Sequence, residues 1–293
     1  MITEILASNI GGTATLIGDP PNIMIGSAVK ELTFVAFINN LALVSVFILA
    51  ITLAILVLIY RNRLKTTDEL KVKVMALDER KQLQDPLLLK KCLFVLALTI
   101  GAFCFHQLLH LESATVAISG AILLLVMTYA KSEHELERVF HKVEWLTIFF
   151  FVGLFILVSG LVETGVISVL AKDLMKLTEG NSLATSMVIL WLSAIASAFV
   201  DNIPFVATMI PLIKEMGTMG VTNLEPLWWS LALGACLGGN GTLIGASANV
   251  IVVGLAAQSG HSISFMKFFK VAFPLMLLSI MISSVYIYLR YLI

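Results

Sequence analysis

Two aspartates of this chain lie in otherwise apolar stretches, where an ionised side chain is unfavourable in free energy. Asp19 precedes Pro20, and Asp201 precedes Asn202. Each could cap the helix that follows it, because an aspartate at this position accepts hydrogen bonds from free backbone N–H groups. Each could instead bind H⁺ or Na⁺ at membrane depth, a common role of carboxylates there. We favour ion binding for both, and we interpret Glu163, at the predicted end of a span, as an ordinary surface acid.

Asp19 belongs to a segment that occurs twice in the chain. The tetrapeptide Thr-Leu-Ile-Gly at 15–18 returns at 242–245, and the same spacing of 227 residues places Asn22 on Asn249. Both copies are small, polar and helix-breaking, yet both lie inside strongly apolar stretches. Duplicated breaks of this kind are the sequence feature that best marks the binding site of a transporter.

A break in a membrane helix explains why these residue types occur together. Unwinding frees backbone N–H and C=O groups, which are tolerated at membrane depth only against protein or a watery cavity. The half-helix N-termini then suit an anion, while the freed carbonyls suit a cation or a hydroxyl group. The candidate ligands for a substrate or a coupling ion are Ser8, Asn9, Gly12, Thr13, Thr15, Asp19 and Asn22 in the first copy, Asn240, Thr242, Ser247 and Asn249 in the second, and Asp201 and Asn202 between them.

Composition indicates an all-α polytopic membrane protein. Apolar residues make up 59% of the chain and charged residues 13%, against about 45–50% and about 25% in soluble domains. We expect an integral protein of the plasma or inner membrane, built as an inverted-repeat transporter with broken helices and a re-entrant hairpin. The predicted parts are the end of a first repeat over 1–60 (broken helix 1–30, span 34–60), a basic cytoplasmic linker over 61–91, and a second repeat over 92–293 (spans 92–109, 114–130, 145–162 and 271–291, re-entrant hairpin 183–213, broken helix 227–257).

The distribution of basic residues orients these spans. The segment 61–91 is rich in lysine and arginine, which places it in the cytoplasm by the positive-inside rule. Counting crossings from there makes the two broken segments run in opposite directions, the inverted repeat that alternating-access carriers use. Trp228 and Trp229, with the tyrosines at 286–291, then fall at outer ends, as an aromatic belt would.

Other chemistry has little support in the sequence. His106 and His110 share a helical spacing but lack a third ligand for a metal. The three cysteines stand singly in apolar segments, so we interpret them as packing residues. Nucleotide-binding, zinc-protease and serine-hydrolase motifs do not occur. We therefore expect no enzyme activity, no metal, no nucleic-acid partner, and no cofactor apart from H⁺ or Na⁺ as a coupling ion.

Three motifs carry a resemblance to a known family. Residues 8–23 (SNIGGTATLIGDPPNI), Val143-Glu144-Trp145 with Gly153-Leu154-Phe155, and 201–205 (DNIPF) resemble the ArsB/NhaD permeases, and within them the P-protein (pink-eyed dilution) subgroup. The resemblance implies inverted repeats, each with a re-entrant hairpin and a broken helix. It also implies transport of arsenite, of sodium in exchange for protons, or of carboxylates in citrate-transporter-like relatives, by proteins that are usually homodimers.

The chain departs from the family pattern in one respect. In the family, several spans and a hairpin precede the first broken helix, whereas this chain begins with that half repeat absent. We therefore expect a secondary-active permease for a small inorganic ion or small anion, either a Na⁺/H⁺ antiporter or an arsenite or anion carrier. The competing hypothesis is a truncated, transport-inactive scaffold or sensor that keeps the fold. Neither break contains lysine or arginine, which weakens a dicarboxylate substrate without excluding it.

Overall fold

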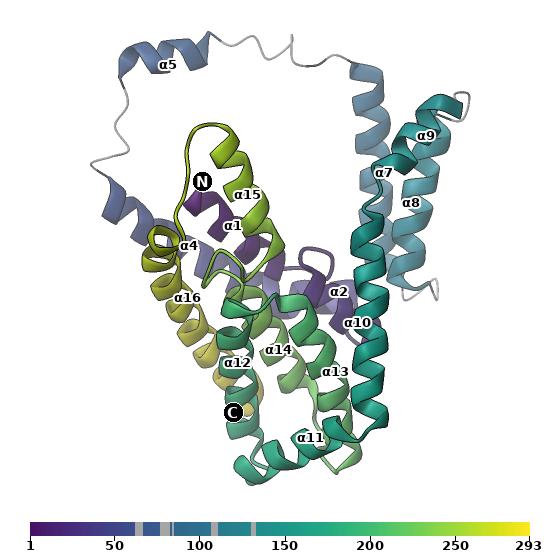
Figure 1. Ribbon diagram of the computed structural model, residues 1–293, viewed down its shortest axis with the longest axis vertical. Coiled ribbons are helices and arrows are strands. Elements are labelled where there is room, and N and C mark those ends of the chain that lie inside the picture. The colour runs from purple at the N-terminus through teal and green to yellow at the C-terminus, as the bar shows by residue number, and fades with distance from the viewer. Residues whose placement is uncertain (62–66, 77–82, 84, 107–110, 130–132) are drawn as a thin grey trace. The chain divides into compact units, whose positions relative to one another are not determined.

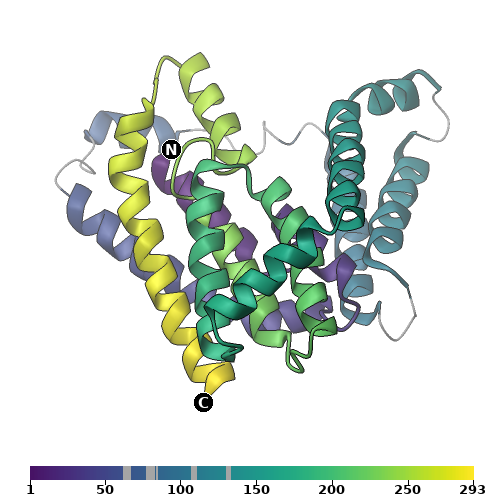
Figure 2. The same cartoon turned by 60° about the horizontal axis from the view of Figure 1, so that its bottom comes forward.

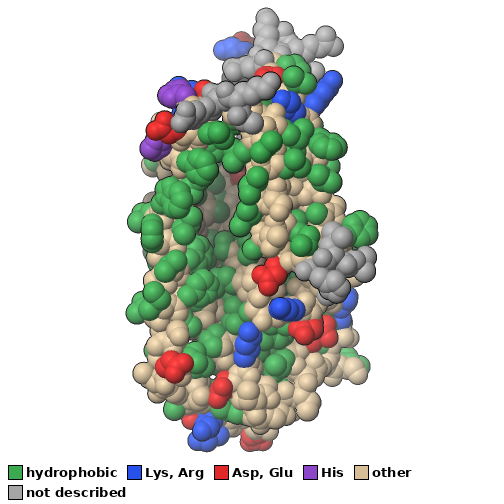
Figure 3. Space-filling model, turned by 90° about the vertical axis from the view of Figure 1, so that its right-hand side faces the viewer, with side chains coloured by type: hydrophobic (Ala, Val, Ile, Leu, Met, Phe, Trp, Pro, Cys, Tyr) green, Lys and Arg blue, Asp and Glu red, His purple; other side chains and the backbone are tan. Residues whose placement is uncertain are grey.

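The computed structural model describes residues 1–61, 67–76, 83, 85–106, 111–129 and 133–293. Throughout these ranges every regular element is a helix (Figure 1). Helices long and apolar enough to cross a bilayer occupy Phe34–Tyr60, Pro86–Phe105, Trp145–Glu163, Ser182–Phe199 and Phe265–Leu292. Figure 3 shows many hydrophobic side chains on an outer face of the molecule. The chain is therefore an all-α, multi-pass integral membrane protein, as its composition predicts.

The chain forms two compact units, one of Met1–Leu56 with Phe149–Ile293 and one of Val57–Ile148. The first unit contains both breaks and the predicted hairpin. Its helices are α1 (Ile2–Thr13), α2 (Pro20–Ala28), α3 (Phe34–Phe37), the π-helix η1 (Ile38–Ala42), α4 (Leu43–Tyr60), α10 (Trp145–Glu163), α11 (Val166–Leu177), α12 (Ser182–Phe199), α13 (Asn202–Thr218), α14 (Glu225–Gly238), α15 (Ser247–Gln258), α16 (Phe265–Ile287) and the π-helix η2 (Tyr288–Leu292).

Helix α14 is the centre of the first unit. Every residue from Pro226 to Gly238 is buried, and the helix contacts α1, α2, α12, α13 and α16. Two views show α16 running alongside α12 (Figure 1, Figure 2). A membrane helix this deeply enclosed positions the break that follows it, because neighbours on all sides hold its end.

Small residues let α12 approach α14 closely. A Cβ atom added at Gly234 would lie 2.5 Å from the carbonyl oxygen of Leu190, and one added at Gly238 would lie 2.5 Å from that of Ala194. Glycines four residues apart thus face one neighbouring backbone, the arrangement by which membrane helices gain van der Waals contact.

The tryptophans of α14 do not form an aromatic belt. Trp228 and Trp229 are 4% and 0% exposed. The indole nitrogen of Trp229 donates to Oε1 of Glu225 at 3.1 Å, and its ring meets that of Phe37 edge-on at 5.1 Å. The predicted belt role of both residues is wrong, because the neighbouring helices enclose this end of α14 and leave neither ring facing lipid.

The second unit is a helical hairpin with short additions. It contains α5 (Asp68–Met75), α7 (Pro86–Phe105), α8 (Ser113–Tyr129) and α9 (Glu133–His141). Asp85 caps α7 by accepting from the backbone nitrogens of Leu87 and Leu88 at 3.0 and 2.9 Å. Helix α7 thus begins six residues before the predicted span. Lys91 ties α7 to α8 by donating to the carbonyl of Met127 at 2.7 Å.

Candidate functional site

The two breaks have matching backbones. The first spans residues 14–19 between α1 and α2, and the second spans 239–246 between α14 and α15. The residues before the second half-helices, Asp19 and Ala246, are 227 positions apart and have φ/ψ of −147°/140° and −150°/145°. Figure 1 shows α1 and α14 approaching their breaks from opposite ends of the first unit. The sequence repeat is therefore also a structural repeat.

One asparagine closes each break. Nδ2 of Asn22 donates to the carbonyls of Thr13 and Thr15 at 3.1 and 3.0 Å. Nδ2 of Asn249 donates to those of Gly239 and Thr242, both at 2.8 Å. Both side chains are 0% exposed. They supply donors to carbonyls that unwinding left free, which membrane burial requires.

The repeats also bond to each other across the breaks. Nδ2 of Asn9 donates to Oδ1 of Asn249 at 2.8 Å and to Oδ1 of Asn240 at 2.9 Å. In the other direction, Sγ of Cys236 donates to Oδ1 of Asn22 at 3.3 Å. All five side chains are buried. Most of the amide groups predicted to bind a substrate are thus engaged in holding the two breaks together.

The α12–α13 hairpin places its tip against the second break. The Ser197 hydroxyl donates to the carbonyl of Ala235 at 2.7 Å, and that of Thr242 donates to the carbonyl of Ala198. A Cβ atom at Gly245 would lie 2.8 Å from the carbonyl oxygen of Ser197. Helices α12 and α13 cover the segment 183–213, and the junction between them meets a break.

The second arm of the hairpin is longer than predicted. Helix α13 continues to Thr218, and α12 is long enough to count as a span by length and composition. The length of the two arms therefore does not by itself indicate a re-entrant path. The contacts of its tip with the break are the observation in favour of a re-entrant path, which stays a prediction.

The two aspartates differ in their local roles. Oδ1 of Asp201 accepts from the backbone nitrogen of Ile203 at 3.1 Å, so Asp201 caps α13. Asp19 occupies the N-cap position of α2, but its side chain makes no cap hydrogen bond. Its carboxyl group lies beside Cys236 and Asn202 instead, within electrostatic range of Asp201. Capping therefore accounts for Asp201 and does not account for Asp19.

Asn202 offers a donor close to the Asp19 carboxyl group, but the two do not reach hydrogen-bond geometry. Its side chain is 2% exposed, and Nδ2 has no hydrogen-bond partner by standard geometry. A buried, unpaired polar atom usually has a ligand, an ion or a water in the working protein. Asp19, Asp201 and Asn202 together form what we call the aspartate junction, where the first break meets the hairpin tip.

The remaining candidate residues fall into two groups. Gly12 packs on the backbone of Gly18, and the Thr13 hydroxyl donates to the carbonyl of Asn9 at 2.9 Å, so both serve the first break. Ser8 and Ser247 have exposed side chains, and Thr15 is half-buried.

Within the ranges that the structure describes, no group of three His, Cys, Asp or Glu could hold a metal. His110 lies outside the described residues, and Nδ1 of His106 lies 2.7 Å from the carbonyl oxygen of Phe103.

Comparison with known proteins gives the family. A family model described as "Citrate transporter" (CitMHS) matches residues 1–234, most of the chain. The chain belongs to the citrate transporter family. An uncharacterized transporter of Mycobacterium tuberculosis is 43% identical over 99% of this chain and 67% of its own length. The 46 kDa membrane protein of Mycobacterium leprae is 39% identical, over 100% and 68%. The human P protein is 33% identical, over 98% and 43%. The resemblance found in the sequence motifs is thereby confirmed.

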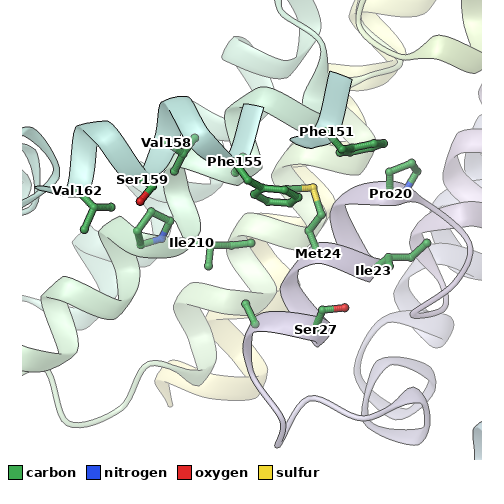
Figure 4. Close-up of a pocket in the computed structure, with 13 residues that line it drawn as sticks. Pro20, Ile23, Met24, Ser27, Phe151, Phe155, Val158, Ser159, Val162 and Ile210 are labelled. Atoms are coloured by element: carbon green, nitrogen blue, oxygen red, sulfur yellow. The ribbon is translucent and has the colours of Figure 1, made fainter. Parts of the chain in front are cut away.

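The chain also has an apolar cavity whose lining includes Pro20, the residue after Asp19. Its volume is about 810 Å³, and helices α2, α10 and α13 line it (Figure 4). Pro20, Met24, Phe155 and Ile210 are typical of its walls, with Ser27 and Ser159 among them. Apolar walls do not replace the hydration shell of an ion, so this cavity does not itself hold a charged substrate.

Sequence reasoning missed one member of this site. Cys236 was interpreted as a packing residue, yet it bonds to Asn22 and lies beside Asp19. The signal was available, because the repeat spacing of 227 residues places Cys236 on Asn9. A repeat position that is polar in one copy indicates a contact in the other.

Proposed function

We propose that this membrane transporter is a secondary-active ion carrier that couples H⁺ or Na⁺ at the aspartate junction by alternating access. One observation supports the proposal most directly: the Asp19 carboxyl group lies beside Asn202 and within electrostatic range of Asp201, without a capping role. A carboxylate at membrane depth that does not serve the local backbone is best explained by an ion pathway.

The chemistry of the junction suits cation exchange. Two neighbouring carboxylates repel each other in a medium of low dielectric, and a bound proton or Na⁺ relieves that repulsion. Among the residues that the structure describes, Asp19 and Asp201 form no salt bridge with a basic side chain. A mobile cation is therefore the partner that we propose, and alternate loading with H⁺ and Na⁺ gives antiport.

Substrate choice follows from the groups that remain free. The Nδ2 of Asn202 and the N-terminus of α15 with exposed Ser247 can donate hydrogen bonds. Such donors suit neutral arsenite, or a carboxylate held by helix N-termini. The family name indicates citrate for this second option. We propose that any such substrate is carried with the cation, since the breaks hold no basic residue.

A transport-inactive scaffold is the alternative. The bonds of Asn9, Asn22 and Asn249 join the two breaks, an arrangement that would also suit a rigid protein. The alternatives differ in what Asp19 must do, because a scaffold needs no carboxylate there.

The test is dissipation of a pH gradient in proteoliposomes that carry the full-length protein, with Na⁺, Li⁺, arsenite or citrate added separately. Asp19→Asn and Asp201→Asn are compared with Glu163→Gln, which removes an exposed acid at the end of α10. A Na⁺ or Li⁺ signal lost in Asp19→Asn and kept in Glu163→Gln is expected. Arsenite or citrate flux that Asp19→Asn leaves intact would overturn cation coupling at Asp19. No flux with any solute would favour the scaffold.

Homodimer formation, also proposed, is tested by the mass of the purified complex.

A further inference from the structure

A second, smaller groove lies where the first and last spans meet and contains no residue of the aspartate junction. Its volume is about 470 Å³, and its walls come from the start of α4 and the end of α16. The lining residues are Leu43, Val44, Phe47, Ile282, Val285 and Tyr286. The one polar group among these side chains, the Tyr286 hydroxyl, already donates to the carbonyl of Asn40. The groove is therefore suited to an apolar chain.

Arg290 lies one helical turn beyond Tyr286, and its guanidinium group is held in place. Nη2 donates to Oδ1 of Asn40 at 2.9 Å, and the group lies 5.8 and 5.7 Å from the ring centres of Tyr286 and Tyr291. Cation–π contact with two rings and one hydrogen bond orient the cation. Because it is oriented before binding, an anion that meets it loses less conformational entropy.

The charge of Arg290 is not neutralised within the described part of the chain. Its side chain is exposed, and no carboxylate lies within ion-pair distance. Glu225 is near Tyr291, but its Oε1 accepts from the indole of Trp229 at 3.1 Å. A guanidinium carries five N–H donors in a fork that fits a phosphate, and few of them are used here.

The position of Arg290 along its span indicates the class of ligand that it would meet. Arg290 lies near the end of the apolar helix Phe265–Leu292, where headgroups begin, with tyrosines around it as at a membrane interface. We propose that one anionic phospholipid binds here, with an acyl chain in the groove and its phosphate on Arg290. The apolar groove and the unpaired cation are separate observations, and a lipid is the ligand that uses both. The proposal does not depend on what the protein transports.

The experiment titrates purified full-length protein in detergent with dioleoyl phosphatidylglycerol or dioleoyl phosphatidylcholine and counts bound lipids by native mass spectrometry. We expect one phosphatidylglycerol bound at least tenfold more tightly than phosphatidylcholine. Arg290→Gln should lose that preference, and Arg290→Lys should keep most of it. Val285→Trp should fill the groove and weaken both lipids.

The matched control is Lys270→Gln, which removes an exposed cation near the other end of the same helix and should bind as the parent does. Equal binding of the two lipids by the parent protein would overturn the proposal. So would unchanged preference in Arg290→Gln, or unchanged binding in Val285→Trp. Displacement of the lipid by inorganic phosphate at equal concentration would indicate a free-anion site and also contradict it. Melting temperatures of all variants show that each is folded.

Discussion

Cys236 donates to Asn22, and this contact is the counterpart of the one that Asn9 makes with Asn249. Each bond joins a residue of one repeat to the closing asparagine of the other, at 3.3 and 2.8 Å. The donors are equivalent positions in the repeat, as are the acceptors. The two breaks are therefore held by a crossed pair of bonds, in which a thiol has taken the place of one amide.

This arrangement gives the Asn249 side chain three hydrogen bonds, as many as that of Asn22. Asn249→Ala removes two donors to backbone carbonyls and the acceptor of Asn9, all buried. We expect the free energy of unfolding to fall by about 3 kcal/mol, roughly 1 kcal/mol for each lost bond. Thermal unfolding in detergent measures it. Asn39→Ala, at an exposed position, is the control and should have little effect. Equal melting temperatures for the two variants would contradict the role given to Asn249.

Close packing of α12 on α14 predicts a difference between two glycines. Gly238→Ala would bring a Cβ atom 2.5 Å from the carbonyl oxygen of Ala194, whereas Gly254→Ala meets no atom within 4 Å. Overpacking should destabilise Gly238→Ala by about 1–3 kcal/mol. Gly254→Ala, inside helix α15, should be neutral or stabilising by up to about 1 kcal/mol. Melting curves of both variants check this, and a stable Gly238→Ala would show that the helices can separate.

The two aspartates should respond differently to removal of the side chain. Asp201→Ala loses the cap of α13 and should destabilise by about 1 kcal/mol. Asp19→Ala removes no cap bond, so its folding stability should not fall for that reason. Stability of each variant is read from thermal unfolding, and flux from proteoliposomes. If Asp19→Ala unfolds more readily than Asp201→Ala, then Asp19 is structural, and its proposed role in coupling loses its basis.

Asn202 should show a conflict between stability and activity. Asn202→Leu keeps the approximate shape and removes a buried donor that has no partner. Because an unsatisfied buried group is unfavourable by about 1–3 kcal/mol, the variant should melt at the same temperature or higher. Transport should be lost, because the junction loses a donor. A melting temperature lower by several degrees would mean that Asn202 is bonded within the folded protein.

Much of the architecture could be predicted from local features. The breaks lie where glycine and proline interrupt apolar runs, and α2 and α15 begin at equivalent positions, Pro20 and Ser247. Helix ends were less accurate, as the extension of α13 to Thr218 shows. Helix α13 continues through Pro211, which removes one backbone bond, and the next residues, Leu212 and Ile213, are buried against neighbouring helices.

The sequence by itself determined the membrane class, the family and the presence of a repeated break, because composition, motif and spacing are properties of the chain. Only the tertiary structure decided which polar groups remain free. Asn9 and Asn249 are separated by 240 residues, yet Nδ2 of Asn9 donates to Oδ1 of Asn249, whereas Asn202, beside Asp201 in the chain, leaves its Nδ2 unpaired. The physical reason is that a hydrogen bond depends on where two groups meet in space. The sequence gives the groups that can form hydrogen bonds, and the packing of α1, α13 and α14 decides which of these groups meet.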